Sequence, residues 1–285
     1  METRNNEEIR ETVRQSYGKI ARAGGVISES SQRLSCCGPS ETATGTIRQS
    51  SGCGAADFSG ENISAIMGYS EEDIGSVPEG ANMGLGCGNP VAVASLNPGE
   101  TVVDLGSGGG FDCFLAGKEV GETGKVIGVD MTPDMVGKAR KNAEKMGTKN
   151  VEFRLGEIEH LPVADNSADI IMSNCVINLS PEKPEVYRDA FRVLKPGGRL
   201  AISDIIATAR LPEEIKKNLT LVSACVGGAA TIDETEDMLK QAGFRDIKIN
   251  AKEISRELIS EWAPGSNAGD YVVSAYIEAV KPMDL

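Results

Sequence analysis

The sequence contains a single histidine, His160, and none of its seven cysteines forms a CxxC pair. A zinc site with the usual His and Cys spacing therefore cannot be built, and general-base catalysis by a pair of histidines is excluded. His160 lies in Glu-His-Leu-Pro, which is typical of a surface loop, and a lone histidine there carries no functional prediction.

Aromatic residues and positive charge are also scarce. The chain has 1 Trp, 5 Tyr and 6 Phe, which does not favour a base-stacking platform for nucleic acid. Its 29 Lys and Arg against 42 Asp and Glu give a net charge of −13, so it has no general electrostatic reason to bind nucleic acid or an anionic membrane.

Long apolar runs are missing as well. No run approaches the roughly 18 residues that a membrane span needs. The N-terminal stretch is charged and lacks the apolar region of a secretory signal. We therefore expect a cytoplasmic protein, and a monomer, with neither a nucleic acid nor a membrane as its partner.

The pattern of the chain changes near residue 60. Residues 6–22 predict a helix, because apolar side chains recur at spacings of three and four. Residues 28–60 are rich in Ser, Thr and Gly, which indicates a flexible segment. We therefore divide the chain into residues 1–62, an N-terminal helical and loop extension that carries cysteines, and residues 63–285, the main domain.

From residue 100 onward, strand patterns alternate with helix patterns. We expect helices at 61–67, 111–120, 133–147, 182–194, 212–227 and 233–242, and strands at 101–105, 125–130, 151–155, 168–173, 199–206, 244–250 and 271–280. Lys195-Pro-Gly-Gly198 should form the turn before the fifth strand. This alternation predicts an α/β fold with a doubly wound, seven-stranded, mostly parallel sheet.

A glycine-rich loop follows the first predicted strand. Asp104-Leu-Gly-Ser-Gly-Gly-Gly110 would let the backbone approach a ligand, and the helix that it opens would offer unpaired N–H groups. Phe111 stands where the GxGxxG dinucleotide pattern needs glycine, which disfavours a nicotinamide enzyme. Asp130, at the end of the second strand, is placed to accept both hydroxyls of a ribose. Gly156-Glu157-Ile158 after the third strand would lie beside the same crevice.

Three cysteines are predicted to lie near this crevice, because ligands bind beyond the carboxyl ends of the strands in such sheets. Cys175 directly follows the fourth strand, Cys87 stands between two glycines, and Cys225 lies in an apolar helix that could fold over the crevice. Three thiols without histidine suit a soft, thiophilic centre. Each could equally be a buried core residue, as free cysteine often is, and we assign Cys113 to the core.

Asp104-x-Gly-x-Gly-x-Gly110 together with Asp130 resembles the class I S-adenosylmethionine-dependent methyltransferases. The chain resembles the arsenite methyltransferases more closely, over roughly residues 10–250. This resemblance rests on Gly86-Cys-Gly-Asn-Pro90, Gly106-Ser-Gly-Gly-Gly-Phe-Asp-Cys113, Ile127-Gly-Val-Asp-Met-Thr132, Ser173-Asn-Cys-Val-Ile-Asn-Leu179 and Ser223-Ala-Cys-Val-Gly-Gly-Ala229. It implies a Rossmann-like fold, with residues 63–285 as the methyltransferase domain and arsenic-binding helices near 207–242.

The resemblance also implies roles for individual residues. Toward S-adenosylmethionine, Asp104, Gly106, Ser107 and Gly108 would face the amino-acid end, Asp130 the ribose, Met131 and Ile158 the two faces of the adenine, Glu157 its amino group and Asn174 the sulfonium. Cys87, Cys175 and Cys225 would bind trivalent arsenic. Thiol-bound As(III) keeps a lone pair and has no proton to lose, so methyl transfer to it needs positioning more than a base.

Cysteines of the N-terminal extension would serve the redox steps that this family implies. Methylation formally oxidises arsenic to As(V), and thiols return it to As(III) while forming a disulfide that an external reductant resolves. Cys36, Cys37 and Cys53 are the candidates, and we favour Cys36 or Cys37. The implied function is arsenic detoxification, with arsenite and small thiols as partners and glutathione, thioredoxin or an equivalent as the thiol reductant.

Two other functions stay open at this point. A methyltransferase for a small organic acceptor, such as a quinone or a lipid precursor, would share the cofactor motifs but would not need Cys87 and Cys225. A non-catalytic protein that binds soft metals through thiols would explain the cysteines, but would leave the Asp104–Gly110 loop and Asp130 without a purpose.

Overall fold

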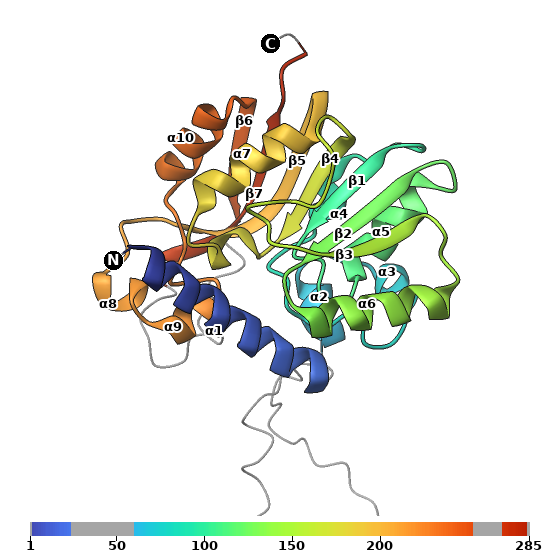
Figure 1. Ribbon diagram of the computed structural model, residues 1–285, viewed down its shortest axis with the longest axis horizontal. Helices are drawn as coiled ribbons and strands as arrows, with labels where there is room; N and C mark the ends of the chain where they lie inside the picture. The colour runs from blue at the N-terminus through green and yellow to red at the C-terminus, as the bar shows by residue number, and fades with distance from the viewer. Residues whose placement is uncertain (1, 24–59, 253–269, 284–285) are drawn as a thin grey trace, which may run out of the picture.

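The computed structural model describes residues 2–23, 60–252 and 270–283, which form a central sheet with helices packed around it (Figure 1). Seven strands lie in the order β3-β2-β1-β4-β5-β7-β6. Neighbouring strands are parallel except at β7, which runs antiparallel to both β5 and β6. The predicted seven-stranded, mostly parallel, Rossmann-like sheet is thereby confirmed.

The strands are β1 (Thr101–Leu105), β2 (Lys125–Asp130), β3 (Val151–Leu155), β4 (Ala168–Asn174), β5 (Leu194–Ala207), β6 (Arg245–Lys252) and β7 (Val272–Val280). The helices are α1 (Glu2–Ala23), α2 (Gly60–Ile66), α3 (Glu71–Gly75), α4 (Pro90–Ala94), α5 (Phe111–Val120), α6 (Pro133–Met146), α7 (Lys183–Val193), α8 (Glu213–Lys216), α9 (Leu219–Ser223) and α10 (Ile232–Ala242), with a 3-10 turn η2 (Ile177–Leu179). None of the helices in the part of the chain described is long and apolar enough to cross a membrane.

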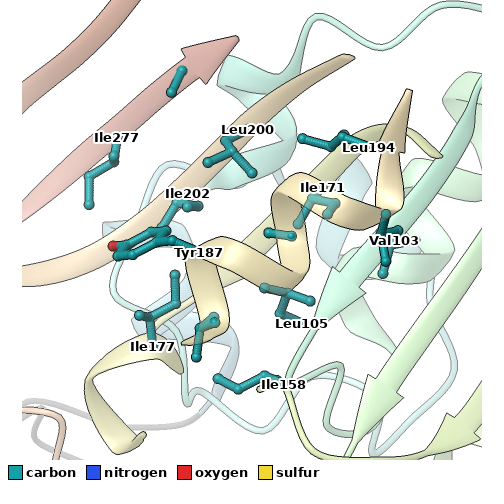
Figure 2. Packing of buried hydrophobic residues seen from close by; sticks show 14 of the residues in the cluster. Val103, Leu105, Ile158, Ile171, Ile177, Tyr187, Leu194, Leu200, Ile202 and Ile277 are labelled. Carbon is teal, nitrogen blue, oxygen red and sulfur yellow. The ribbon is translucent and has the colours of Figure 1, made fainter. Parts of the chain in front are cut away.

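Apolar side chains alternate between the two faces of the sheet and pack under helices on both. Val103 of β1 belongs to a cluster that takes in residues of α7 and α10, whereas the adjacent Val102 belongs to a cluster with α5 and α6. Figure 2 shows part of the first cluster, with Tyr187 of α7 and Ile202 of β5 among its members. Each such aliphatic side chain contributes about 1.5–3 kcal/mol when it is fully buried. The layered core therefore holds the strand ends in fixed positions.

The predicted helix at 212–227 is wrong. The segment forms two short helices instead, α8 and α9, because the Asn218 side chain accepts hydrogen bonds from the N–H groups of Thr220 and Leu221 and starts a new helix. Cys225 lies beyond the end of α9, with a left-handed φ of 62°. The predicted turn at 195–198 is also wrong, since these residues belong to β5, beside a register shift between Ala168 and Ile170 of β4.

The order of the strands reverses between β1 and β4, because the chain adds β2 and β3 on one side of β1 and later adds β4 and β5 on the other. Ligands of such sheets bind in the crevice beyond the carboxyl ends of the strands at this point. The helix α1 packs against α6 and α9, and in Figure 1 it extends from the side of α8 and α9 toward α6.

Candidate functional site

A cleft opens at the carboxyl ends of β1, β2 and β4. Most of the residues predicted to hold the cofactor line it: Asp104, Gly106, Ser107, Gly108, Asp130, Met131, Ile158 and Asn174. Cys175 lines the same cleft, next to Asn174 at the end of β4. Because the carboxyl ends of these parallel strands lie at one edge of the sheet, side chains from three separate stretches of the sequence meet in the cleft.

The glycine loop is shaped so that backbone, rather than side chains, faces the cleft. Gly106 has a φ of +67°, and a Cβ at this position would lie 2.4 Å from the Val176 side chain. The N–H of Gly108 donates to Asp130 Oδ2 at 3.0 Å, which ties the loop to the end of β2. The Ser107 hydroxyl is buried and has no hydrogen-bond partner among the described residues. A polar ligand that donates or accepts here would satisfy it.

The Asp130 carboxylate is held in place by backbone N–H groups of Thr132 and Gly108. Its Oδ1 accepts a hydrogen bond of 2.8 Å from the N–H of Thr132. Burial raises the pKa of Asp130, and the N–H groups of Thr132 and Gly108 work against that rise. The carboxylate is therefore oriented by fixed donors before any ribose hydroxyl reaches it.

A second buried acid, Asp112, lies at the start of α5. The Tyr69 hydroxyl donates to its Oδ1 at 2.5 Å, and Asn174 Nδ2 donates to its Oδ2 at 3.0 Å. Burial raises the pKa of Asp112, and burial together with the Asp112 charge raises the pKa of Asp104 well above its ordinary value. The thiol of Cys113, a core residue as predicted, donates to Asp104 at 3.1 Å.

The three predicted arsenic ligands, Cys87, Cys175 and Cys225, are buried in one apolar cluster. Cys87 Sγ, Cys175 Sγ and a carboxylate oxygen of Asp204 all lie within 4.8 Å of one another. Cys225 Sγ donates to the carbonyl of Cys175 at 2.8 Å. Burial raises the pKa of the Cys87 thiol, and burial with the neighbouring Cys225 and Cys87 thiols raises that of Cys175 further. These two thiols are therefore protonated near pH 7.

The backbone at the three cysteines is constrained. Cys175 and Cys225 have left-handed φ angles of 59° and 62°, which cost a residue with a side chain about 1–2 kcal/mol each. Cys87 is set by close packing instead. A Cβ on Gly86 would lie 2.6 Å from Asn174 Nδ2, and one on Gly88 would lie 2.2 Å from Ser203 Oγ. The two glycines that flank Cys87 therefore let its loop lie directly against β4 and β5.

Some predicted residues are not in the cleft. Glu157 is absent from the lining, and its Oε1 accepts a long hydrogen bond of 3.4 Å from Arg14 of α1. His160 is exposed, in agreement with the prediction of an ordinary surface residue. Cys36, Cys37 and Cys53 lie outside the described residues.

Sequence reasoning missed several residues that line the cleft. These are Arg10 and Tyr17 of α1, Tyr69, Asp112 and Glu159. Asp112 could have been found, because it directly follows the glycine loop. Glu159 directly follows the predicted Gly156-Glu157-Ile158 element. Nothing in the local sequence of Tyr69 or of the N-terminal helix signals their approach to the site.

Comparison with known proteins agrees with this geometry. Residues 96–243 match a family model described as a methyltransferase domain. The arsenite methyltransferase of Halobacterium salinarum is 50% identical over 279 residues, which cover 98% of this chain and 68% of the relative. That of Aquipseudomonas alcaligenes is 43% identical over 179 residues, covering 60% of this chain and 51% of the relative.

A solved structure carries the same likeness. The crystal structure of an arsenic(III) S-adenosylmethionine methyltransferase from Chlamydomonas reinhardtii superposes with a TM-score of 0.57 at 31% identity, covering 77% of this chain and 73% of that one. The fold, the lining of the cleft and the similar sequences all indicate a methyltransferase. The chain therefore belongs to the arsenite methyltransferases, within the class I S-adenosylmethionine-dependent methyltransferases.

Proposed function

We propose that this chain methylates trivalent arsenic, which it holds through Cys87, Cys175 and Cys225 beside the cofactor cleft. The observation that carries the proposal is the burial of these three thiols in one cluster, with Cys175 also lining the cleft. Neither a quinone nor a lipid precursor would require a group of thiols there. A thiol-based metal sequestrant would have no use for the oriented Asp130 and the glycine loop.

The cleft suits S-adenosylmethionine, which supplies an electrophilic methyl group on its sulfonium when bound. Gly106 and Gly108 would admit the amino-acid end close to the backbone, and the Ser107 hydroxyl is free to bond it. Asp130 would accept the ribose hydroxyls, and Met131 and Ile158 would contact the adenine. Glu157 would need to turn away from Arg14 to reach the adenine amino group.

The buried thiols suit arsenite because no charge has to be created. Three thiols and neutral As(OH)₃ form three S–As bonds, and each thiol proton leaves with a hydroxyl as water. The product keeps its lone pair and needs no base to activate it. Holding acceptor and donor in the right geometry can supply about 7–11 kcal/mol of the barrier, and a chain with one histidine can do this.

Turnover adds a redox requirement to this proposal. Methylation oxidises As(III) to As(V) formally, so two electrons must return from thiols, which become a disulfide. Cys36 or Cys37 would take part, with glutathione, thioredoxin or an equivalent as the final reductant. Detoxification in the cytoplasm, by a monomer, stays a prediction.

The test is to incubate the purified chain with arsenite, a thiol and labelled S-adenosylmethionine, and to identify the methylated products. Replacing Cys175 or Cys225 by Ser should abolish methylation and reduce arsenite binding, while the affinity for S-adenosylmethionine survives. Cys113→Ser is the matched control, because a hydroxyl can still donate to Asp104 and arsenite binding should keep its stoichiometry. Full activity in either site variant would refute the ligand assignment.

A further inference from the structure

The N-terminal helix reaches the cysteine cluster directly. Val13 of α1 is a buried member of this cluster, and Tyr17, one helical turn later, packs against it and lines the cleft. The Tyr17 hydroxyl donates to the carbonyl of Ser223 at 3.3 Å. Burial, followed by the nearby Cys225 and Cys175 thiols, raises the pKa of Tyr17. A residue that is about 200 positions away in sequence therefore contacts the turn that carries the third thiol.

Cys225 lies on a short turn to which Tyr17 adds a contact from another part of the chain. The turn follows α9, a helix of five residues, and precedes Gly227 and Gly228, and its own hydrogen bonds include those from the Cys225 N–H to the Val222 carbonyl and from Cys225 Sγ to the Cys175 carbonyl. Its sulfur is outside the group of Cys87, Cys175 and Asp204 atoms that lie within 4.8 Å of one another. Cys87 and Cys175 lie in loops packed on the sheet, whereas the Cys225 turn is covered by α1.

A salt-bridge network holds α1 on the site. Arg10 of this helix pairs with Glu159 at 3.6 Å and also with Glu182, and Glu159 accepts a hydrogen bond of 2.5 Å from Ser180. Glu159 and Ser180 line the cleft. This network therefore helps to hold α1, and with it Tyr17, against the cysteine cluster.

We propose that Tyr17 is a positioning residue for arsenic capture, whose hydroxyl holds the Ser223–Cys225 turn so that Cys225 joins Cys87 and Cys175 as the third ligand. This inference rests on the proposed function. The Tyr17 hydroxyl would thus determine whether arsenic is bound by three sulfur atoms or by two. Without the hydroxyl, arsenite keeps two sulfur ligands and one exchangeable hydroxyl, and it dissociates faster.

Tyr17→Phe tests this, because it removes the hydroxyl and keeps the ring. The probes are arsenite, which can take three thiols, and phenylarsonous acid, whose carbon substituent leaves room for only two. Affinities are measured from the ultraviolet absorbance of sulfur-bound arsenic. We expect arsenite affinity to fall about tenfold, as for the loss of a hydrogen bond of about 1.4 kcal/mol, while phenylarsonous acid binds as before. The affinity for S-adenosylmethionine, measured by calorimetry, should stay the same.

Two further variants sharpen the result. Tyr187→Phe changes a buried tyrosine of α7 that lies in a different cluster, and it should leave both arsenicals unaffected. In a Cys225→Ser background, Tyr17→Phe should cause no additional loss of arsenite affinity, because its effect acts through Cys225.

The possible failures are distinguishable. If the unmodified chain binds S-adenosylmethionine but not arsenite, the proposed function itself fails. If the unmodified chain binds arsenite and Tyr17→Phe matches it, only the role of Tyr17 is overturned. Equal losses for both arsenicals, or additive losses in the Cys225→Ser background, would also overturn it, since they would indicate a general disturbance of the fold.

Discussion

The backbone N–H of Cys87 donates a hydrogen bond of 3.0 Å to Asn174 Oδ1, so that the loop before β1 is attached to the end of β4. The Asn174 amide also donates to Asp112 and Tyr69, at 3.0 Å each. The amide nitrogen donates to the carbonyl of Gly88 as well, at 2.9 Å, so both ends of the Asn174 side chain hold the loop that carries Cys87. The nitrogen also reaches Asp112 and Tyr69, so one side chain contacts both a thiol-bearing loop and residues of the cofactor cleft.

Asn174→Ala should weaken both kinds of binding at once. The Cys87 N–H, the Tyr69 hydroxyl and Asp112 would lose a buried partner, and each such loss costs about 1–3 kcal/mol. We expect the affinities for S-adenosylmethionine and for arsenite each to fall about tenfold or more, as measured by calorimetry and by thiolate–arsenic absorbance. Asn150→Ala is the control, because Asn150 bonds carbonyls of Gly117 and Gly121 away from the cleft and should alter stability alone. A change in only one of the two affinities would contradict the shared role.

Asp130→Ala should act on the cofactor alone. It removes a carboxylate that fixed N–H groups orient toward the cleft, and it leaves the cysteine cluster untouched. The affinity for S-adenosylmethionine should fall about 10- to 100-fold, since two charge-assisted hydrogen bonds are lost. Equilibrium dialysis with labelled cofactor measures this, with arsenite binding as the internal reference. An unchanged cofactor affinity would remove Asp130 from the ribose role.

Gly88→Ala should displace the Cys87 loop. The added Cβ would lie 2.2 Å from Ser203 Oγ but 3.2 Å from Ser203 Cβ, so the hydroxyl is the main obstacle. We expect a loss of about 1–3 kcal/mol in unfolding free energy, together with weaker arsenite binding. Adding Ser203→Ala should restore part of both. If the double variant is as impaired as the single one, the contact with Ser203 does not limit this loop.

The pH dependence of stability should report Asp204. Burial raises its pKa to about 6 against an ordinary value of 3.8, although N–H groups of Ile205 and Ile177 oppose this rise. The folded state therefore holds the proton more tightly, so the Asp204 contribution to stability falls as pH rises from 3.8 to about 6 and is constant above that range.

Asp204→Asn removes that titration. The difference in unfolding free energy between the two proteins should therefore change by up to about 3 kcal/mol across this window. Urea unfolding at several pH values between 4 and 8 measures the difference. Parallel stability curves for the two proteins would show that Asp204 has an ordinary pKa.

Much of the fold could be predicted because its strands are short apolar runs with glycine, proline or charged residues on both sides. The predicted bounds of β1, β2 and β3 match those observed. The approach of Cys175 to the cleft also followed from topology, since a residue after β4 must lie at the carboxyl edge of the sheet.

The features that escaped prediction are set by packing across the chain. The segment 212–227 is apolar enough for one helix, but the Asn218 cap and the left-handed Cys225 break it. Neither the approach of α1 to the cysteines nor the contact of Tyr69 with Asp112 has a local signal, because both join segments that are far apart in sequence.

The left-handed backbone at Cys175 and Cys225 has a consequence for the speed of metalloid uptake. Because both residues adopt their strained conformation when the chain folds, little ordering of these two thiols remains to be done when a metalloid arrives. The cysteine cluster should therefore bind the metalloid at a rate that is governed by access through the cleft and not by rearrangement of the main chain. Short peptides carrying the same cysteines would lack this advantage.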